Sequence, residues 1–225
     1  MNKIKAVRTS VAIVAWLTLL LLSKYVKLSS LLGSSTMFIG GVATITPLLG
    51  GLFSASSTGM LLTGLVGIAA LLHQIPITAG VPTMLATLSW ATSRYNNNHI
   101  LSIALHVILP LTCMVIFALH PVAHYAFAYT LYWLIPPCVW LARHYGYGTG
   151  IFMTALQASF VAHAIGGTIW LFIVPMTANQ WLSLIPLVAV ERLTFAGISA
   201  LSFYLIQYSV DAVKNLRVKK PLTTP

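Results

Sequence analysis

Long apolar runs recur along this 225-residue chain, and charged residues hardly interrupt them. Only 6% of the residues are charged, whereas soluble domains carry charge on about a quarter of theirs. A chain of this kind cannot cover a water-facing surface. We therefore expect an all-α fold, a polytopic bundle of transmembrane helices. No polar stretch is long enough for a second domain, so residues 1–225 are expected to form a single integral membrane domain, with basic cytoplasmic tails at 1–8 and 214–225.

Five runs match the length of a membrane span, because a bilayer core about 30 Å thick is crossed by a helix of about 20 apolar residues. They are Thr9–Leu28, His99–Leu119, Pro121–Ala142, Thr149–Pro175 and Leu182–Ser209. The region between the first two, Met37–Trp90, is apolar but is interrupted by prolines and glycines. It supplies either one further span or three, and the three would be Met37–Phe53, Ser57–His73 and Pro76–Ala91.

The basic residues set the expected orientation. Lysines and arginines gather before the first run and after the last, so the positive-inside rule predicts that both ends are cytoplasmic. The number of spans is then even. We favour six over eight because the three pieces of Met37–Trp90 are short. Arg94 and Arg143 fall on the cytoplasmic side under both counts, whereas Lys24 and Lys27 are exceptions. We expect a multi-pass protein of the cell inner (plasma) membrane.

A stripe of small residues within Met37–Trp90 predicts close helix packing. Its members recur every four residues and are Gly51, Ala55, Gly59, Thr63 and Gly67. On one helix they share a face that lets a second helix approach closely, within this chain or in a partner. The stripe also favours one continuous helix through Ser54–Thr58, and so the six-span count. Alternatively, these residues are simply common in membrane helices.

Ionisable residues at membrane depth are costly and are candidates for function. Glu191 and Arg192 lie about 14 Å into the last run, near the middle of a bilayer. Adjacent helical residues point about 100° apart, so we expect each of the two to have its own partner. They form either a substrate-binding or proton-handling site or a structural ion pair. His163, in the preceding run, shares one helix face with Ser159, Gly166 and Trp170, and is expected to reach Glu191 or Arg192.

Aromatic side chains extend this candidate site. Tyr132 and Trp133 precede the Pro136–Pro137 pair, which is expected to kink or end the helix and to free carbonyl groups. Trp133 and Trp170 would suit a flat heterocycle. Arg192 would suit a carboxylate and Glu191 a cation, so we expect a zwitterionic ligand. The predicted substrate-binding residues are Glu191, Arg192, His163, Trp170, Trp133 and Tyr132. Aromatic residues in a bundle also serve as ordinary core.

Several kinds of chemistry are not expected. The two cysteines, Cys113 and Cys138, form neither a disulfide scaffold nor a zinc cluster. His120 and His124 have metal-ligand spacing, but Pro121 separates them, so a loop at the membrane interface is the better account. No hydrolase, metalloprotease or nucleotide-binding motif occurs in the sequence, and basic residues at the ends of runs indicate lipid contact rather than nucleic acid. We predict no catalytic residue, no metal and no cofactor.

Two passages of the second quarter are rich in glycine and proline. Residues 46–51 read Thr-Pro-Leu-Leu-Gly-Gly and run into Gly-Leu-Val-Gly at 64–67, and residues 75–83 read Ile-Pro-Ile-Thr-Ala-Gly-Val-Pro-Thr. Such passages, in a small basic membrane protein, are similar to those of the vitamin-binding S components of energy-coupling factor transporters, including the biotin type. The resemblance implies a six-helix capture protein that works with a transmembrane coupling subunit and an ATPase pair. The family's A-x-x-x-A docking motif is absent, and Ala6–Ser10 is its nearest match.

Two hypotheses about function follow. The first is a non-catalytic transport protein, the substrate-capture subunit for a vitamin-like or other small organic micronutrient. The alternative is a membrane-embedded enzyme or redox protein that acts on a lipid, quinone or haem, with His106, His163 and Glu191 as its reactive set. Membrane lipids and the solute are the expected partners in the first case.

Overall fold

A computed structural model describes residues 3–23, 44–53, 77–95, 98–148 and 150–218. Within these ranges the chain is almost entirely helical and contains no strand, which confirms the predicted all-α fold. In chain order the helices are α1 (Lys3–Ser23), α4 (Leu48–Leu52), α6 (Ile77–Tyr95), α7 (His99–Ile103), the π-helix η1 (Ala104–Ile108), α8 (Leu109–Leu119), the 3₁₀-helix η2 (Ala123–Leu134), α9 (Ile135–His144), α10 (Ile151–Ile173) and α11 (Ala178–Val218).

Three helices of the described residues are long and apolar enough to cross a membrane. They are His99–Leu119, in which α7, η1 and α8 follow one another without a break, Ile151–Ile173 and Ala178–Val213. Each matches one of the predicted runs, so the structure supports a membrane bundle. The last helix is longer than predicted, and its 41 residues pass through Pro186 and reach beyond a bilayer core. The number of spans and the side of each terminus stay predictions.

The two remaining predicted runs differ from simple spans. Helix α1 ends at Ser23, and its apolar part is Thr9–Leu22, so the end of the predicted first run lies outside the described residues. The run Pro121–Ala142 is built from η2, which is bent at Ala126, and then α9. Pro136 and Pro137 lie in the first turn of α9, where missing amide hydrogens cost little. The helix was expected to kink or end at these prolines, and η2 does end at Leu134, directly before them, while the prolines themselves lie in the first turn of the next helix.

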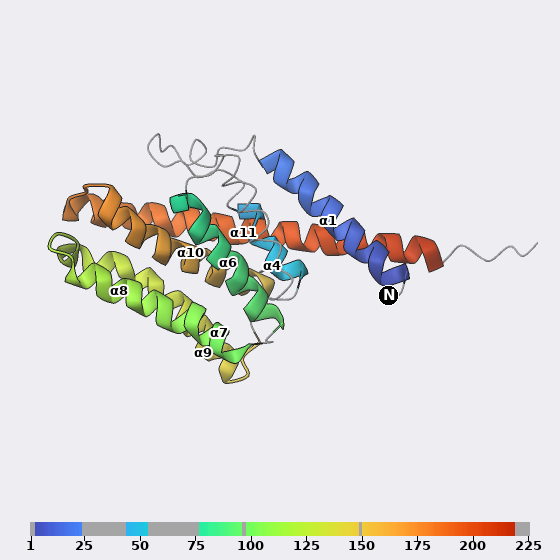
Figure 1. Cartoon of the computed structure of the whole chain (residues 1–225), viewed down its shortest axis with the longest axis horizontal. Helices are drawn as coiled ribbons and strands as arrows, with labels where there is room; N and C mark the ends of the chain where they lie inside the picture. Colours follow the sequence, from blue (N-terminus) through green and yellow to red (C-terminus); the bar gives the residue numbers. More distant parts are fainter. Residues whose placement is uncertain (1–2, 24–43, 54–76, 96–97, 149, 219–225) are drawn as a thin grey trace, which may run out of the picture.

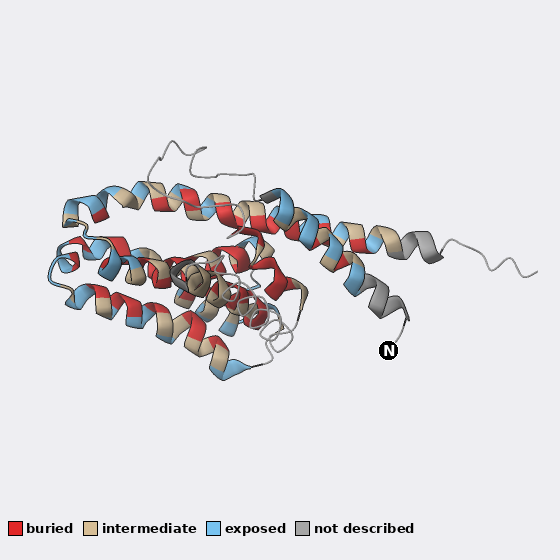
Figure 2. Cartoon of the chain, turned by 45° about the horizontal axis from the view of Figure 1, so that its top comes forward, coloured by how far each residue is buried: buried red, intermediate tan, exposed pale blue. Residues whose placement is uncertain are grey.

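Helix α10 lies at the centre of the bundle and packs most extensively against α6 and then α11 (Figure 1). The α7–η1–α8 helix runs beside η2 and α9, and α1 packs on α11. Buried residues gather on the sides of the helices that face one another, while exposed residues lie outside (Figure 2). The largest fully buried side chains include Trp90, Trp133, Trp181, Phe117 and Phe160. Close van der Waals packing of these rings holds the helices together, because lipid tails are as apolar as leucine and give no hydrophobic driving force between helices. The leucines on the outer faces suit lipid.

The short α4 segment is fastened between three other helices. Trp16 of α1 donates its indole N–H to the Ile45 carbonyl at 3.1 Å. Tyr95 of α6 donates to the Gly51 carbonyl at 3.1 Å, and Ser199 of α11 donates to the Thr44 carbonyl at 2.8 Å. These bonds satisfy carbonyl groups that lie outside a long helix, which is what allows irregular backbone inside a membrane bundle.

The predicted small-residue stripe is not carried by one helix that starts at Gly51. Helix α4 ends at Leu52, and Phe53 is extended, with φ −126° and ψ 155°. The expectation of one helix running from Gly51 through Ser54–Thr58 is therefore wrong at its beginning. The other stripe members, Ala55, Gly59, Thr63 and Gly67, lie outside the described residues. At Gly51 itself neighbouring helices do come close, since an added Cβ would lie 2.7 Å from Trp90 Nε1 of α6 and 3.1 Å from Phe203 Cε2 of α11.

Candidate functional site

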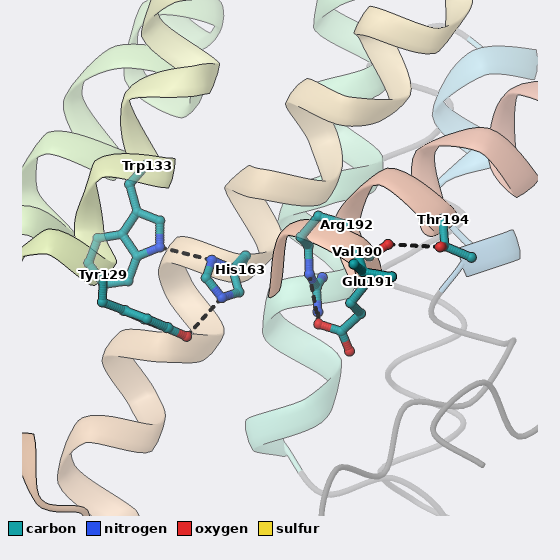
Figure 3. Close-up of polar contacts among 7 residues, drawn as sticks. All are labelled: Tyr129, Trp133, His163, Val190, Glu191, Arg192 and Thr194. Atoms are coloured by element: carbon teal, nitrogen blue, oxygen red, sulfur yellow. Dashed lines mark hydrogen bonds and ion pairs between the residues drawn. The ribbon is translucent and has the colours of Figure 1, made fainter. Parts of the chain in front are cut away.

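Glu191 and Arg192 form a salt bridge with each other inside the bundle (Figure 3). The Arg192 side chain turns back along α11, so that Nη2 and Nε donate to Glu191 Oε2 at 2.8 and 3.2 Å. Their side chains are only 12% and 4% exposed. The expectation of separate partners is therefore wrong. A charged guanidinium that is shielded from water needs a nearby carboxylate to balance its charge. The arginine side chain is long and flexible enough to reach the adjacent glutamate, although the two residues point about 100° apart on the helix.

His163 lies in a separate cluster with both ring nitrogens occupied. Trp133 donates its indole N–H to Nδ1 at 3.0 Å, and the Tyr129 hydroxyl lies 2.8 Å from Nε2 (Figure 3). An indole can only donate, so Nδ1 accepts and Nε2 carries the hydrogen that Tyr129 accepts. His163 is thus a neutral, buried linker between η2 and α10. The described residues show no hydrogen bond between His163 and either Glu191 or Arg192.

The other predicted site residues fall into different surroundings. Trp133 is fully buried and donates its indole N–H to His163. Tyr132 donates its hydroxyl to the Ile185 carbonyl at 3.0 Å and stacks on Phe160, so it ties η2 to α11 and α10. Trp170 is 38% exposed on the outer side of α10 and does not join them. The predicted residues therefore do not form a single pocket. They lie in two separate polar clusters, and the Trp170 ring faces outward.

The Tyr129 hydroxyl is expected to contribute to stability. In Tyr129→Phe the His163 N–H loses its acceptor in a buried setting, so we expect a loss of about 1–3 kcal/mol in the free energy of unfolding. Thermal unfolding of the purified protein in detergent measures this. Tyr125→Phe is the matched control, because Tyr125 is 74% exposed. Equal transition temperatures for the two variants would contradict the assignment.

A third polar cluster surrounds His106, which was a weak candidate from the sequence because it lies only about 10 Å into its span. Here α7 widens into the π-helix η1, a distortion that is frequent at functional sites. The His106 ring is fully buried. Its Nε2 atom lies 2.9 Å from the Ser89 hydroxyl oxygen and 3.2 Å from the Ser93 hydroxyl oxygen. Its Nδ1 atom lies 3.1 Å from the Ser102 hydroxyl oxygen. Nε2 also lies 3.2 Å from the Ser89 carbonyl oxygen.

Gln157 and Arg143 extend the His106 cluster toward one end of the bundle. The Ser93 hydroxyl donates to Gln157 Oε1 at 2.9 Å, and Gln157 Nε2 donates to the Pro136 carbonyl at 2.9 Å. Arg143 Nη1 donates to the Ser93 carbonyl at 3.1 Å, and Nη2 donates to the Thr154 hydroxyl. Arg143 lies just past the predicted span. Burial lowers the pKa of its guanidinium from the ordinary value, and arginine stays charged even so.

Residues of this network line a cavity of about 170 Å³, which we call the inner pocket. Its lining residues come from α6, α7, α9 and α10 and are Thr92, Ser93, His99, Ser102, Trp140, Arg143, His144 and Gln157. None of them is acidic. The rings of Trp140 and His144 stack with centroids 5.4 Å apart and planes 8° apart, and His99 approaches the Trp140 ring at 5.9 Å. Charge, hydroxyl groups and flat rings are therefore combined in one hollow.

The sequence contains a pattern that indicates this cluster, although the position of His106 near the end of its span made the residue a weak candidate. Ser89 and Ser93 are four residues apart, and so are Ser102 and His106, so each pair shares one helix face. Gln157 is the matching polar residue of α10. What the pattern lacked was the register between these helices, which decides that the three faces meet.

The four histidines singled out in the sequence, His106, His120, His124 and His163, take part in hydrogen bonds. The described residues contain no group of three or more histidine, cysteine or acidic side chains that could hold a metal ion. His106 and His163 use both ring nitrogens in hydrogen bonds and belong to different clusters. His120 accepts from the Val122 and Ala123 amides, and His124 Nδ1 lies 3.0 Å from the His120 carbonyl oxygen. The last two therefore organise the turn between α8 and η2, as predicted for a loop.

Comparison with known proteins leaves the assignment to the geometry. No protein-family model, no curated protein and no solved structure matches the chain.

Proposed function

We propose that the protein is a non-enzymatic, solute-binding membrane protein of the transport class, and that the inner pocket holds a small organic anion. One observation carries the proposal: a polar pocket with a guanidinium and stacked rings is built into an apolar bundle. A buried polar network that supports such a pocket keeps its lining side chains in place before the ligand arrives, which lowers the cost of binding.

The lining residues suggest the chemistry of the ligand. Arg143 supplies positive charge, and no lining carboxylate opposes it, which favours an anion over the zwitterion suggested by the sequence. The faces of Trp140, His99 and His144 suit a flat ring. The volume of about 170 Å³ is below the roughly 300 Å³ at which pockets for drug-sized molecules begin. The ligand is accordingly a compact, vitamin-like molecule with a carboxylate or a similar group.

The orientation predicted from the basic residues bears on the role. The positive-inside rule assigns the Arg94 and Arg143 end of the bundle to the cytoplasm, so the inner pocket opens on that side. It therefore receives or releases the solute at the cytoplasmic face of the inner membrane. A coupling subunit with an ATPase pair, as the S-component resemblance implies, is the proposed source of energy, because the sequence has no nucleotide-binding motif.

The arrangement around His106 favours binding over catalysis. A serine nucleophile would need a histidine nitrogen that accepts its proton. The Ser93 hydroxyl instead donates to Gln157 Oε1. The Ser89 carbonyl beside His106 Nε2 can only accept, so Nε2 carries a hydrogen and cannot act as a base for Ser93. With that hydrogen on Nε2, Nδ1 accepts from the Ser102 hydroxyl at 3.1 Å, and the ring is held by a backbone carbonyl rather than by a carboxylate. Because a catalytic histidine is usually oriented by an acidic group, we assign the cluster a supporting role.

Removing one ring from the inner pocket is expected to weaken ligand retention. The wild-type chain should co-purify with an organic anion that mass spectrometry identifies. In Trp140→Ala and His144→Ala, retention of the same anion should fall about tenfold, which corresponds to the free energy of one or two aromatic ring contacts. His144 is exposed, so its variant should fold even if Trp140→Ala does not.

The matched control is His124→Ala, an exposed histidine about 30 Å away at the other end of the α7–η1–α8 helix. It should retain the anion like the wild type. Repeated purification without any bound organic molecule, or equal retention in His144→Ala and His124→Ala, would contradict the proposal.

A further inference from the structure

A second cavity, of about 390 Å³, lies beside the inner pocket at the same end of the bundle; we call it the outer cavity. It is formed where α6 and α9 end and α10 begins. Its lining residues are Ser93, Arg94, Arg143, Gly146, Tyr147, Gly148, Ile151 and Thr154. Ser93 and Arg143 line both hollows, whereas Arg94 and the glycine-containing turn line only the outer one. The proposed solute site makes no use of that part.

Two arginines from different helices converge on the outer cavity. Arg143 is half-buried and is held by the Ser93 carbonyl and the Thr154 hydroxyl. Arg94 is exposed, and its guanidinium carbon lies 4.6 Å from the centre of the Phe203 ring, a cation–π contact that limits its freedom. The two acidic residues of the chain are Glu191, paired with Arg192, and Asp211, and neither lines the cavity. Two like charges around one hollow attract an anion.

The turn that follows α9 contributes glycines to the lining of the outer cavity. Gly146 has φ +81°, which favours glycine, and at both Gly146 and Gly148 an added Cβ would meet no atom within 4 Å. The backbone of this turn is therefore open to a ligand. The hydroxyl groups of Ser93 and Thr154 also line the cavity, but they already donate to Gln157 Oε1 and to the Gly150 carbonyl. Two guanidinium groups around an open space suit a group with several anionic oxygens better than a single carboxylate.

We infer that the outer cavity binds a phosphate group, as inorganic phosphate or a phosphorylated solute, or as the headgroup of an anionic phospholipid. Both sources present the same oxygens to Arg94 and Arg143. The exposed Tyr145 and Tyr147 at this end of the bundle are side chains typical of the membrane–water interface, where either source is at hand. The site shares Arg143 and Ser93 with the inner pocket, while Arg94 and the turn at Gly146–Gly148 belong to the outer cavity alone.

The experiment uses the full chain, purified in an uncharged detergent, with two probes. One is radiolabelled inorganic phosphate, and the other is dihexanoyl phosphatidylglycerol, with dihexanoyl phosphatidylcholine as the comparison lipid. Arg94→Gln should weaken phosphate-group binding about tenfold, the value of a lost charged hydrogen bond, and Arg94→Lys should weaken it less. Gly148→Leu should weaken it by filling the cavity. Gly197→Leu, on α11, makes the same change at another glycine where a Cβ meets nothing, and should leave binding unchanged.

Binding of inorganic phosphate alone would support a soluble source, and binding of phosphatidylglycerol but not phosphatidylcholine would support a lipid headgroup. The inference is overturned if neither probe binds, or if Arg94→Gln and Gly148→Leu both bind like the wild type. Trp140→Ala, which changes only the inner pocket, should leave phosphate binding intact, so the failure of one proposal is distinguished from the failure of the other.

Discussion

Glu191→Gln is expected to destabilise the protein by about 3 kcal/mol, the lower end of the cost of breaking a buried ion pair. The substitution keeps the shape of the side chain but leaves the Arg192 charge in an apolar setting, with only 12% of its side chain exposed. The remaining contact of the guanidinium, 4.9 Å from the Phe195 ring centre, does not replace a carboxylate. The free energy or the midpoint temperature of unfolding in detergent measures the loss.

Two further variants separate a structural from a functional role of this pair. Replacing both residues by leucine should restore most of the stability, since exchanging a whole buried pair for apolar side chains is often neutral or favourable. Asp211→Asn removes the same charge at an exposed position of α11 and should change stability by no more than about 0.5 kcal/mol. If the double variant is stable but transports no solute, the pair is functional. If Glu191→Gln is as stable as Asp211→Asn, the buried pair is not holding the fold.

Gly50→Ala is expected to cost about 3 kcal/mol, which is the upper range for overpacking a buried site. The added methyl group would lie 2.0 Å from the Thr87 carbonyl oxygen and 2.8 Å from the Ala91 amide nitrogen. Both are backbone atoms of α6, so no rotation of a side chain relieves the clash. The α4 segment must move away from α6, and the hydrogen bond from Tyr95 to Gly51 is expected to break with it.

Gly166→Ala is the matched control on α10. There the new Cβ would meet only Pro82 Cγ, at 3.8 Å, an ordinary contact. Alanine also favours a helix over glycine, so this variant should gain up to about 1 kcal/mol. Opposite shifts in unfolding temperature for the same chemical change would establish that the backbone contact of α4 with α6 is responsible. Similar shifts would exclude it.

Parts of the candidate sites could be predicted from the sequence because they depend on single residues. Glu191, Arg192 and His163 were identified because polar groups are costly at membrane depth, and each has a buried polar partner in the structure. Their partners could not be predicted. The sequence spacing between His163 and Tyr129 is 34 residues, and which residues of two helices meet depends on how the helices are rotated and shifted against each other.

The His106 cluster illustrates the same limit more strongly. Ser89 and His106 are 17 residues apart, and Ser93 and Gln157 are 64 apart. Each residue taken alone is an unremarkable polar side chain near the end of a span. The π-helix at Ala104–Ile108 turns His106 toward Ser89, and an apolar periodicity does not reveal a single widened turn.

The recurring apolar runs determined by themselves that this is a helical membrane protein, because the cost of exposing apolar surface and bare backbone depends on composition and run length alone. Only the tertiary structure decided that Glu191 pairs with Arg192, that the helix carrying Gly51 ends at Leu52, and that the arginine-lined pockets lie where α6, α9 and α10 meet. Those outcomes depend on the register between the helices. Many registers bury similar apolar surface and so have similar energy. Close packing and the pairing of buried polar groups select one of them.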